Sequence, residues 1–396
     1  MNSIYLPKAH WLRHSQLDNS FVHSLLISLM RGLAAIQVTA AHLRSEMFPG
    51  LKGMADPPLY YQLLAFATGF AHQAVVVFFL ISGWLVGGSL LNRFRQEGAL
   101  LSYTIDRATR LWTVLLPAMC LMLAVGVFIS EADPASGDFA AANEYSAASF
   151  LGNLLGLQTV LVKNFGGNYA LWSLANETWY YIQFPLLLLV FMGKSRLRQL
   201  AAATALVLIA KALPGTITLY FALWLLGALF SRVRIECGNA FRVTLVLAAI
   251  GCSLYFRVHG SNDDLSFESF LQDLVYSLPL LVILASLQRP LLLRSPFSRG
   301  VAKLAHQLSE FSFTLYVIHI PVIKLLRYLG QQDFGRDKLA VDAPLDYAVY
   351  FGMLLALIGA AYLSYRLFEA HTFRLRRAIK HAVLAHAARP AIVSAK

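Results

Sequence analysis

The sequence has few charged residues for its length. Only 14% of its 396 residues are Asp, Glu, Lys or Arg, whereas 58% are hydrophobic and the mean hydropathy is +0.59. A soluble domain carries about 25% charged and roughly 45–50% apolar residues. The apolar excess is too large for one buried core, so lipid must solvate much of the exterior. The composition therefore excludes an ordinary soluble enzyme.

Cysteine is also scarce, and the glycines form no phosphate-binding motif. Cys120, Cys237 and Cys252 lie in or beside apolar segments, without the spacing of a metal site. No Walker or dinucleotide-binding pattern is present, and the polar first twenty residues do not resemble a cleavable signal peptide. We therefore expect neither a disulfide framework nor a bound metal.

Long apolar runs occupy most of the chain. A transmembrane helix needs about 20 mostly apolar residues, so the sequence predicts an all-α, polytopic membrane bundle of about ten transmembrane helices. We expect one transmembrane domain over residues 21–379, between poorly ordered cytoplasmic tails at 1–20 and 380–396. The predicted spans are residues 24–43, 68–91, 109–130, 169–192, 197–213, 216–231, 241–257, 270–288, 310–330 and 346–369.

Basic residues gather in alternate connections between these spans. A net charge of +12 is compatible with nucleic-acid binding, but the basic clusters are short and lie between apolar runs. The intervening connections are acidic, and the positive-inside rule then places both termini in the cytoplasm. We therefore expect membrane lipids, and no nucleic acid, around the chain. The longest outer connection, 131–168, contains the apolar stretch SFLGNLLGLQTVL, which is too short to span and would lie at the interface or dip into the protein.

One predicted span carries two ionisable side chains. In RGLAAIQVTAAH, Arg31 and His42 are eleven residues apart. Eleven helical residues complete close to three turns, so both side chains point the same way, about 16 Å apart along the axis. Each ionisable group in a bilayer costs roughly 2.5–3.5 kcal/mol on insertion scales, which favours a functional role. The structural alternative is an interfacial histidine and an arginine that reaches toward the headgroups.

Two further ionisable residues lie in apolar segments rich in aromatic side chains. Glu177 stands in LWSLANETWYYIQFP, and His319 stands in FSFTLYVIHIPV. Their structural alternatives are a buried carboxylate paired with arginine and a hydrogen bond between helices. In the functional interpretation both belong to a site, and the aromatic residues stack on a sugar ring. Their neighbours of interest are Trp172, Ser173, Trp179, Tyr180, Tyr181, Ser312 and Tyr316.

Basic and small residues mark the inner ends of two predicted spans. Arg93, Arg107 and Arg110 either satisfy the positive-inside rule alone or clamp phosphate groups, since arginine binds phosphate bidentately. The small-residue segment FFLISGWLVGG, which contains Ser82, either permits close helix packing or lines a narrow channel.

Together these segments resemble the acyltransferase 3 family of integral membrane acyltransferases. RGLAAIQVTAAH resembles the family's signature of an arginine, ten further residues and a histidine. FFLISGWLVGGSLLNR resembles the family's Ser-Gly segment with the arginine that follows it, and RATR resembles its paired arginines. WSLANETWYY, FSFTLYVIHIPV and SYRLFEAHTFRLRR resemble three later motifs, in the family's order, so that the resemblance covers roughly residues 24–377. The chain departs from the pattern at Thr113, Thr178 and His371.

The resemblance implies both a fold and a reaction. Family members have about ten transmembrane helices. They move an acyl group, usually acetyl, from cytoplasmic acyl-CoA to a hydroxyl of a glycan on the outer face. For this chain it implies acyl-CoA as a co-substrate without a bound cofactor, a glycan or lipid-linked sugar as acceptor, and a bacterial inner membrane. Carried over by position, His42 would be the catalytic base, with Glu177 and His319 in the site. The donor would be held by Arg31, Arg93, Arg107 and Arg110, and the substrate by Trp172, Ser173, Trp179, Tyr181, Ser82 and Tyr316.

Several questions stay open at this level. We rank direct transfer above an acyl-enzyme on Ser82, Ser173 or Ser312, and acetyl above succinyl or a longer chain. A transporter or flippase for a lipid-linked sugar would also place polar residues inside such a bundle. A non-catalytic sensor or scaffold fits the hydropathy but leaves the intramembrane histidines unexplained.

Overall fold

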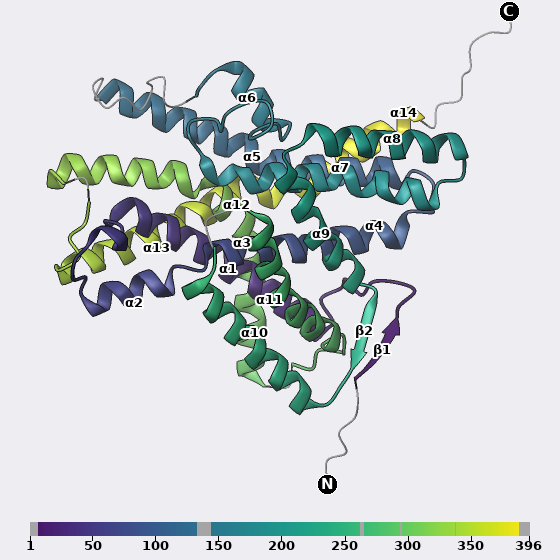
Figure 1. Cartoon of the computed structure of the whole chain (residues 1–396). Helices are drawn as coiled ribbons and strands as arrows, with labels where there is room; N and C mark the ends of the chain where they lie inside the picture. The colour runs from purple at the N-terminus through teal and green to yellow at the C-terminus, as the bar shows by residue number, and fades with distance from the viewer. Residues whose placement is uncertain (1–6, 133–143, 262–264, 294, 337, 388–396) are drawn as a thin grey trace, which may run out of the picture.

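The computed structural model describes residues 7–132, 144–261, 265–293, 295–336 and 338–387 (Figure 1). These residues form a bundle of α-helices with one pair of short strands, which confirms the predicted all-α membrane bundle. The elements are β1 (Lys8–Trp11), α1 (Val22–Met47), η1 (Leu51–Gly53), α2 (Leu59–Ala67), α3 (Ala71–Ser82), η2 (Gly83–Gly87), α4 (Gly88–Arg93), α5 (Ala99–Ala132), α6 (Ala147–Leu154), η4 (Tyr169–Leu171), α7 (Trp172–Met192), α8 (Arg196–Ala212), α9 (Gly215–Phe230), β2 (Val233–Glu236), α10 (Asn239–His259), α11 (Phe267–Ser286), α12 (Pro296–Phe334), α13 (Pro344–Leu367), η5 (Glu369–His371) and α14 (Thr372–Ala387).

Each of the predicted spans overlaps helical structure, although 68–91 covers α3, η2 and α4, and 169–192 covers η4 and α7. Among the described residues, seven helical stretches are long and apolar enough to cross a membrane, and α9 is a shorter apolar helix. α7 carries polar side chains in its apolar stretch, and α8 has only 17 residues. The count of about ten spans therefore stays a prediction. The seven stretches are Val22–Met47, Leu59–Arg93, Ala99–Ala132, Asn239–His259, Phe267–Ser286, Pro296–Asp333 and Pro344–Val383.

The outer surface of the bundle is apolar, as a bilayer requires. α10 has no buried residue at all, although it is long and apolar. Its Leu247 and Val258 are 64% and 63% exposed. Because water would penalise such a surface, lipid is the solvent that fits this face of the protein.

Local sequence signals explain where the longest helix begins and ends. Ser295 and Ser298 form a capping box before α12, and Pro296 occupies its first turn. α12 ends at Phe334 and is followed by Gly335, whose φ of 64° is left-handed and favours glycine. The helix between these two signals is long enough to carry His306 near one end and His319 near its middle.

Segments predicted on the same side of the membrane contact one another. At one end of the bundle, Leu339 N–H donates to the carbonyl of Met47 over 2.7 Å. At the other end, Leu12 N–H donates to the carbonyl of Arg232 over 2.7 Å, and Lys380 Nζ donates to Ser102 Oγ over 2.7 Å. Figure 1 shows α2 at the left end of the bundle and β1, β2 and α14 at the right. The assignment of the right-hand end to the cytoplasm stays a prediction.

Two segments that we expected to be tails pack against the bundle where the structure describes them. β1 pairs antiparallel with β2, in the register Lys8 to Glu236. After the strand, Ser15 N–H donates to Asn92 Oδ1 over 2.9 Å, and Ser15 Oγ lies 2.8 Å from Ser231 Oγ. The boundary predicted at residue 379 falls inside α14, whereas residues 388–396 lie outside the described part of the chain.

The segment 147–165, part of the predicted outer connection, folds back onto α5 and α7. It contains α6 and a series of tight turns, and Thr159 has a left-handed φ of 66°. Trp112 Nε1 donates to the carbonyl of Leu154 over 2.9 Å, and Trp179 Nε1 donates to that of Gly156 over 3.0 Å. The apolar stretch therefore covers two long helices, in place of crossing the bilayer.

Small residues bring α9 against the turn between α3 and α4. A Cβ atom on Gly83 would lie 1.9 Å from the carbonyl oxygen of Trp224, and one on Gly227 would lie 2.1 Å from that of Leu80. Only glycine permits this approach, which is the close-packing alternative proposed for FFLISGWLVGG. The chain there forms a π-helical turn, η2, immediately after Ser82, a feature often found at functional sites.

Candidate active site

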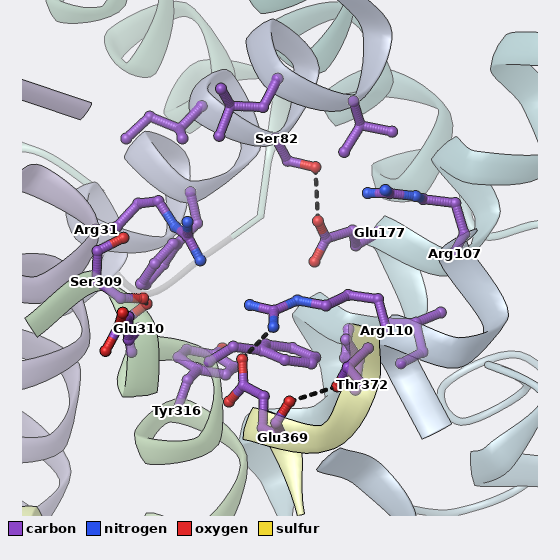
Figure 2. Close-up of a pocket in the computed structure, with 18 of the residues that line it drawn as sticks. Arg31, Ser82, Arg107, Arg110, Glu177, Ser309, Glu310, Tyr316, Glu369 and Thr372 are labelled. Atoms are coloured by element: carbon purple, nitrogen blue, oxygen red, sulfur yellow. Dashed lines mark hydrogen bonds and ion pairs between the residues drawn. The ribbon is translucent and has the colours of Figure 1, made fainter. Parts of the chain in front are cut away.

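A cavity of about 610 Å³, which we call the central cavity, lies among α1, α3, α5, α7 and α12. Residues of η5 and of the first two turns of α14 also line it. It contains arginine, carboxylate, hydroxyl and aromatic side chains from segments far apart in the sequence (Figure 2). Such a concentration of polar groups inside an apolar bundle indicates a functional site.

Three arginines point into the same space. Arg31 comes from α1, and Arg107 and Arg110 come from α5 (Figure 2). Arg110 is paired, because its Nη1 donates to Glu369 Oε1 and its guanidinium lies over the ring of Phe313 at 5.2 Å. Over the part of the chain that the structure describes, Arg31 and Arg107 have no carboxylate within ion-pair distance. Two guanidinium groups are therefore free to bind an anion.

Arg107 is held by an aromatic ring. Its guanidinium lies 5.7 Å from the centre of the Tyr181 ring, and its Nε is buried without a hydrogen-bond partner among the described residues. A buried N–H without a partner costs roughly 1–3 kcal/mol, so a ligand oxygen at this position would be stabilising.

Glu177 is held in place by hydroxyl groups. Ser82 Oγ donates to Glu177 Oε1 over 2.6 Å, and the hydroxyl of Tyr181 donates to the same oxygen. Trp224 Nε1 donates to Ser82 Oγ over 3.1 Å, so the serine bridges α9 to α7. The close approach of α9 at Gly83 makes this chain of hydrogen bonds possible.

The spacing of residues along α7 decides which of them reach the central cavity. Ser173, Glu177 and Tyr181 recur every four residues and lie on one face, which lines the cavity. Trp172 and Trp179, which we expected to bind substrate, do not line it. The Trp172 ring lies 6.3 Å from that of Phe79, and Trp179 binds the carbonyl of Gly156. Their roles as substrate contacts stay predictions without support from the cavity's geometry.

Arg93 does not line the central cavity and lies beside it, near Asp106. Its Nη2 is 3.8 Å from Asp106 Oδ2 and donates to Ser89 Oγ over 2.8 Å. Asp106 is buried, and it also has Arg376 at 3.3 Å and Lys380 at 2.6 Å. One carboxylate thus faces three cations. This group of Arg93, Asp106, Arg376 and Lys380, which we call the rim, therefore keeps a surplus of positive charge.

Several residues of the central cavity were not singled out by the sequence. Glu369 belongs to the motif SYRLFEAHTFRLRR, but only the structure shows that Arg110 Nη1 and Thr314 Oγ1 both donate to its carboxylate. The signal was the motif itself, since an acidic residue stands there before a basic run. The other unexpected lining residues with polar side chains include His306, Ser309, Glu310, Thr372 and Arg376.

The two predicted catalytic histidines form a direct pair. His42 Nδ1 on α1 lies 2.8 Å from His319 Nε2 on α12, and the rings stack with centroids 5.0 Å apart. His319 Nδ1 lies 3.3 Å from the carbonyl oxygen of Leu315, which can only accept. For two neutral rings, one arrangement satisfies both contacts: His319 donates from Nδ1 and accepts at Nε2, and His42 donates from Nδ1. His42 Nε2 then carries a free lone pair, as a general base requires.

The histidine pair does not line the central cavity. Tyr316 and Ser173 line the side of the cavity that faces the histidine pair, and their hydroxyl oxygens are 2.5 Å apart. The centre of the Tyr316 ring is 5.9 Å from that of the His319 ring. The Tyr316 hydroxyl also donates to the carbonyl of Ala170 over 3.1 Å. On its other side, His42 meets the Tyr169 ring at 5.0 Å. The predicted passage is therefore divided, in this conformation, by the Tyr316–Ser173 contact.

The described residues bring together most, but not all, of the predicted site. Arg31, Ser82, Arg107, Arg110, Ser173, Glu177, Tyr181 and Tyr316 line one cavity, and Ser312 lines it too. No three His, Cys, Asp or Glu side chains in the described ranges come close enough to hold a metal ion.

Comparison with known proteins gives one match. A family model described as an acyltransferase domain, of the acyltransferase 3 type, matches residues 25–364. No curated protein and no solved structure matches the chain. The matched range includes α1, α3, α5, α7 and α12, the helices that carry the cavity and the histidine pair.

Proposed function

The chain belongs to the acyltransferase 3 family of membrane acyltransferases, and from this premise we propose that it is an O-acyltransferase that uses cytoplasmic acyl-CoA. The acyl group is acetyl in this proposal, and the acceptor is a hydroxyl of a cell-surface glycan or of a lipid-linked sugar. The location that fits both substrates is a bacterial inner membrane, with the basic end of the bundle in the cytoplasm.

One observation supports the proposal above the others. Arg31 and Arg107 line the central cavity and have no carboxylate partner among the described residues. The His42–His319 pair lies beyond one side of this cavity. Acyl-CoA is a polyanion with a long, narrow arm that ends in a thioester. Arginine binds phosphate through bidentate, charge-assisted hydrogen bonds, so the guanidinium groups suit the anionic end. The imidazole pair suits the reacting end.

The proposed chemistry is a direct transfer. His42 Nε2 takes the proton of the acceptor hydroxyl as that oxygen attacks the thioester carbonyl carbon. The C–O bond forms, the C–S bond breaks, and the proton passes from His42 to the departing thiolate, which leaves as CoA thiol. While His42 is protonated, its Nδ1–H donates to His319 Nε2 and disperses the charge. General-base catalysis of this kind contributes typically 10²–10⁴-fold.

The proposal requires the Tyr316–Ser173 contact to open when donor binds. Both side chains are buried, and their hydroxyls close the central cavity toward His319. Rotation of the Tyr316 side chain would join the cavity to the histidine pair. In the closed state the barrier would protect the thioester donor from water that reaches His42 from the other side.

Two measurements test the proposal. Purified full-length protein in lipid nanodiscs should release CoA thiol from acetyl-CoA, slowly by hydrolysis and faster with an acceptor sugar. Mass spectrometry of surface glycans from cells with and without the protein should show a difference of one acetyl group per modified sugar.

A protein that neither releases CoA thiol nor changes the glycans would contradict the proposal. Movement of an unmodified lipid-linked sugar between leaflets of a vesicle, with acetyl-CoA untouched, would instead support the flippase alternative. Trapping of an acetyl group on Ser82, Ser173 or Ser312 after brief reaction would replace direct transfer by an acyl-enzyme, within the same function.

A further inference from the structure

A second hollow, which we call the lipid-facing groove, is separate from the central cavity. It has a volume of about 1010 Å³ and lies among α4, α7, α9, α11 and the segment after β1. Its lining residues and those of the central cavity do not overlap. Trp224 of α9, fully buried, points toward Ser82 of the cavity, whereas the neighbouring Leu225 lines the groove.

One end of the groove is strongly basic. Arg13, His14, Arg95 and Arg232 line it, and no Asp or Glu of the described residues does. Arg232 has a buried Nε without a partner there, although its Nη1 donates to the carbonyl of Arg13. The exposed Arg13, His14 and Arg95 have no ion-pair partner within the described ranges. This end therefore carries a concentrated and uncompensated positive charge.

The basic end is a built feature. Asn92 of α4 accepts from Ser15 N–H over 2.9 Å and donates to the carbonyl of Ser15 over 3.0 Å. Ser15 also contacts Ser231 at the end of α9, and both serines are buried. The short segment that carries Arg13 is thus tied to both α4 and α9. The backbone that carries Arg13 is held in position before any ligand binds, which lowers the entropy lost on binding.

The rest of the groove is apolar and open to the surroundings of the bundle. Its walls are side chains such as Phe184 and Met192 of α7, Leu225 and Leu229 of α9, and Leu274 of α11. Leu229 is 45% exposed and Met192 is 36% exposed. In a bilayer this wall faces hydrocarbon chains, so the apolar part would be filled by lipid.

We propose that the lipid-facing groove binds one anionic phospholipid from the leaflet beside the β1–β2 ribbon. The phosphate lies against Arg13, Arg95 and Arg232, and an acyl chain follows α7 and α9. A soluble anion would leave the apolar wall unused, and a neutral lipid would leave the cations uncompensated. Basic pockets beside transmembrane helices recognise anionic headgroups by this charge complementarity. The inference is independent of the acyl-transfer reaction.

The test is native mass spectrometry of the full chain in a neutral detergent. Phosphatidylglycerol and phosphatidylcholine with identical acyl chains are titrated in parallel. We expect one phosphatidylglycerol to stay bound preferentially. The triple substitution R13Q/R95Q/R232Q should weaken that binding by roughly tenfold or more, since each cation near the membrane surface adds to the attraction for an anionic headgroup. The substitution Ala222→Trp, which fills the groove without altering charge, should also weaken it.

A matched control removes equal charge elsewhere. The substitutions R289Q/R299Q/K303Q change three exposed basic residues that do not line the groove and lie in connections predicted on the same side. They should leave the tight phosphatidylglycerol intact. Equal losses in both triple variants would overturn the site in favour of diffuse attraction. Displacement of the lipid by millimolar glycerol phosphate, or an unaffected Ala222→Trp variant, would overturn the lipid as occupant. Thermal unfolding of each variant verifies that it is folded.

Discussion

The central cavity and the His42–His319 pair differ in the kind of chemical group that each presents. The central cavity is lined by four arginines. Within the described residues, Arg110 and Arg376 are paired with carboxylates, whereas Arg31 and Arg107 are not. Beyond Tyr316 stands an uncharged end, where the imidazoles of His42 and His319 bind each other. The first end is suited to an anion and the second to a proton. The difference teaches that binding and chemistry are assigned to separate regions, so substitutions in the two regions should fail in different ways.

The largest effect is expected at His42. Substitution His42→Ala removes the only imidazole lone pair that the arrangement leaves free. Transfer from acetyl-CoA should fall by roughly 10²–10⁴-fold in kcat, with little change in the affinity for acetyl-CoA. The control is His259→Ala, at the exposed end of α10, which should keep wild-type activity. Full transfer activity in the His42→Ala protein would show that His42 is not the general base.

A large effect on stability is expected at the paired arginine. Arg110→Gln leaves the buried Glu369 without its cation. Loss of one partner of a buried pair costs about 3–5 kcal/mol, and the lower end applies here because Arg110 faces the cavity. Thermal unfolding in detergent measures the loss. The double variant R110Q/E369Q should recover most of it, and a double variant as unstable as the single one would show that the pair is not the cause.

The unpaired arginines should affect binding more than catalysis. Arg31→Gln or Arg107→Gln each removes one charge-assisted contact to donor, worth about 1.5–3 kcal/mol. The KM for acetyl-CoA should rise by roughly tenfold or more, with a smaller change in kcat. Arg93→Gln is the matched comparison, because Arg93 lies outside the cavity on Asp106. If Arg93→Gln raised the KM for acetyl-CoA more than Arg31→Gln or Arg107→Gln, the donor would bind at the rim and not in the central cavity.

His319 should act through His42. His319→Ala removes the acceptor for His42 Nδ1–H, so the imidazole loses its fixed orientation, and we expect kcat to fall by roughly tenfold, as for supporting contacts behind a reacting imidazole. His319→Gln keeps a carbonyl oxygen that can accept the hydrogen bond from His42 Nδ1–H and should restore part of the rate. A merely structural role predicts that both variants lose activity in proportion to their loss of thermal stability.

The smallest effect is expected at Trp179, outside both regions. Trp179→Phe removes its hydrogen bond to the carbonyl of Gly156 and should lower the free energy of unfolding by about 1 kcal/mol. Acetyl-CoA turnover and acceptor use should stay at the wild-type level. A selective loss of sugar binding in this variant would restore Trp179 to the substrate site and extend the site beyond the cavity.

The sequence was most informative where the physics is local. Apolar runs predicted α1, α3, α5, α7 and α12, because the length and hydropathy of a span are set by its own residues. They did not predict α14, which carries the cavity residues Thr372 and Arg376. The spacing of Arg31 and His42 predicted that both side chains point the same way, since helical periodicity is a local property. In the structure Arg31 lines the central cavity and His42 contacts His319 of α12. The close packing at Gly83 was one of two alternatives that the small residues left open, and the structure supports it.

The sequence was least informative about partners across helices. Nothing in RATR indicates that Arg110 binds Glu369, 259 residues away, whereas Arg107 lies on a tyrosine ring. The tryptophans of WSLANETWYY look equivalent to its serine and glutamate until the register of α7 is known. The segment 8–11 has too little apolar character to predict a strand, and it forms one only because β2 is present as a partner.

By itself, the sequence determined that this protein is a helical membrane bundle with ionisable groups buried at particular positions, because apolar periodicity and motif order are properties of the chain alone. Only the tertiary structure decided which of those groups meet. His42 and His319 are 277 residues apart, and their 2.8 Å contact exists because α1 and α12 pack together. The Tyr316–Ser173 contact that divides the two regions likewise depends on how α7 meets α12. Packing between helices depends on the shapes of all their faces at once, and no local segment of sequence contains that information.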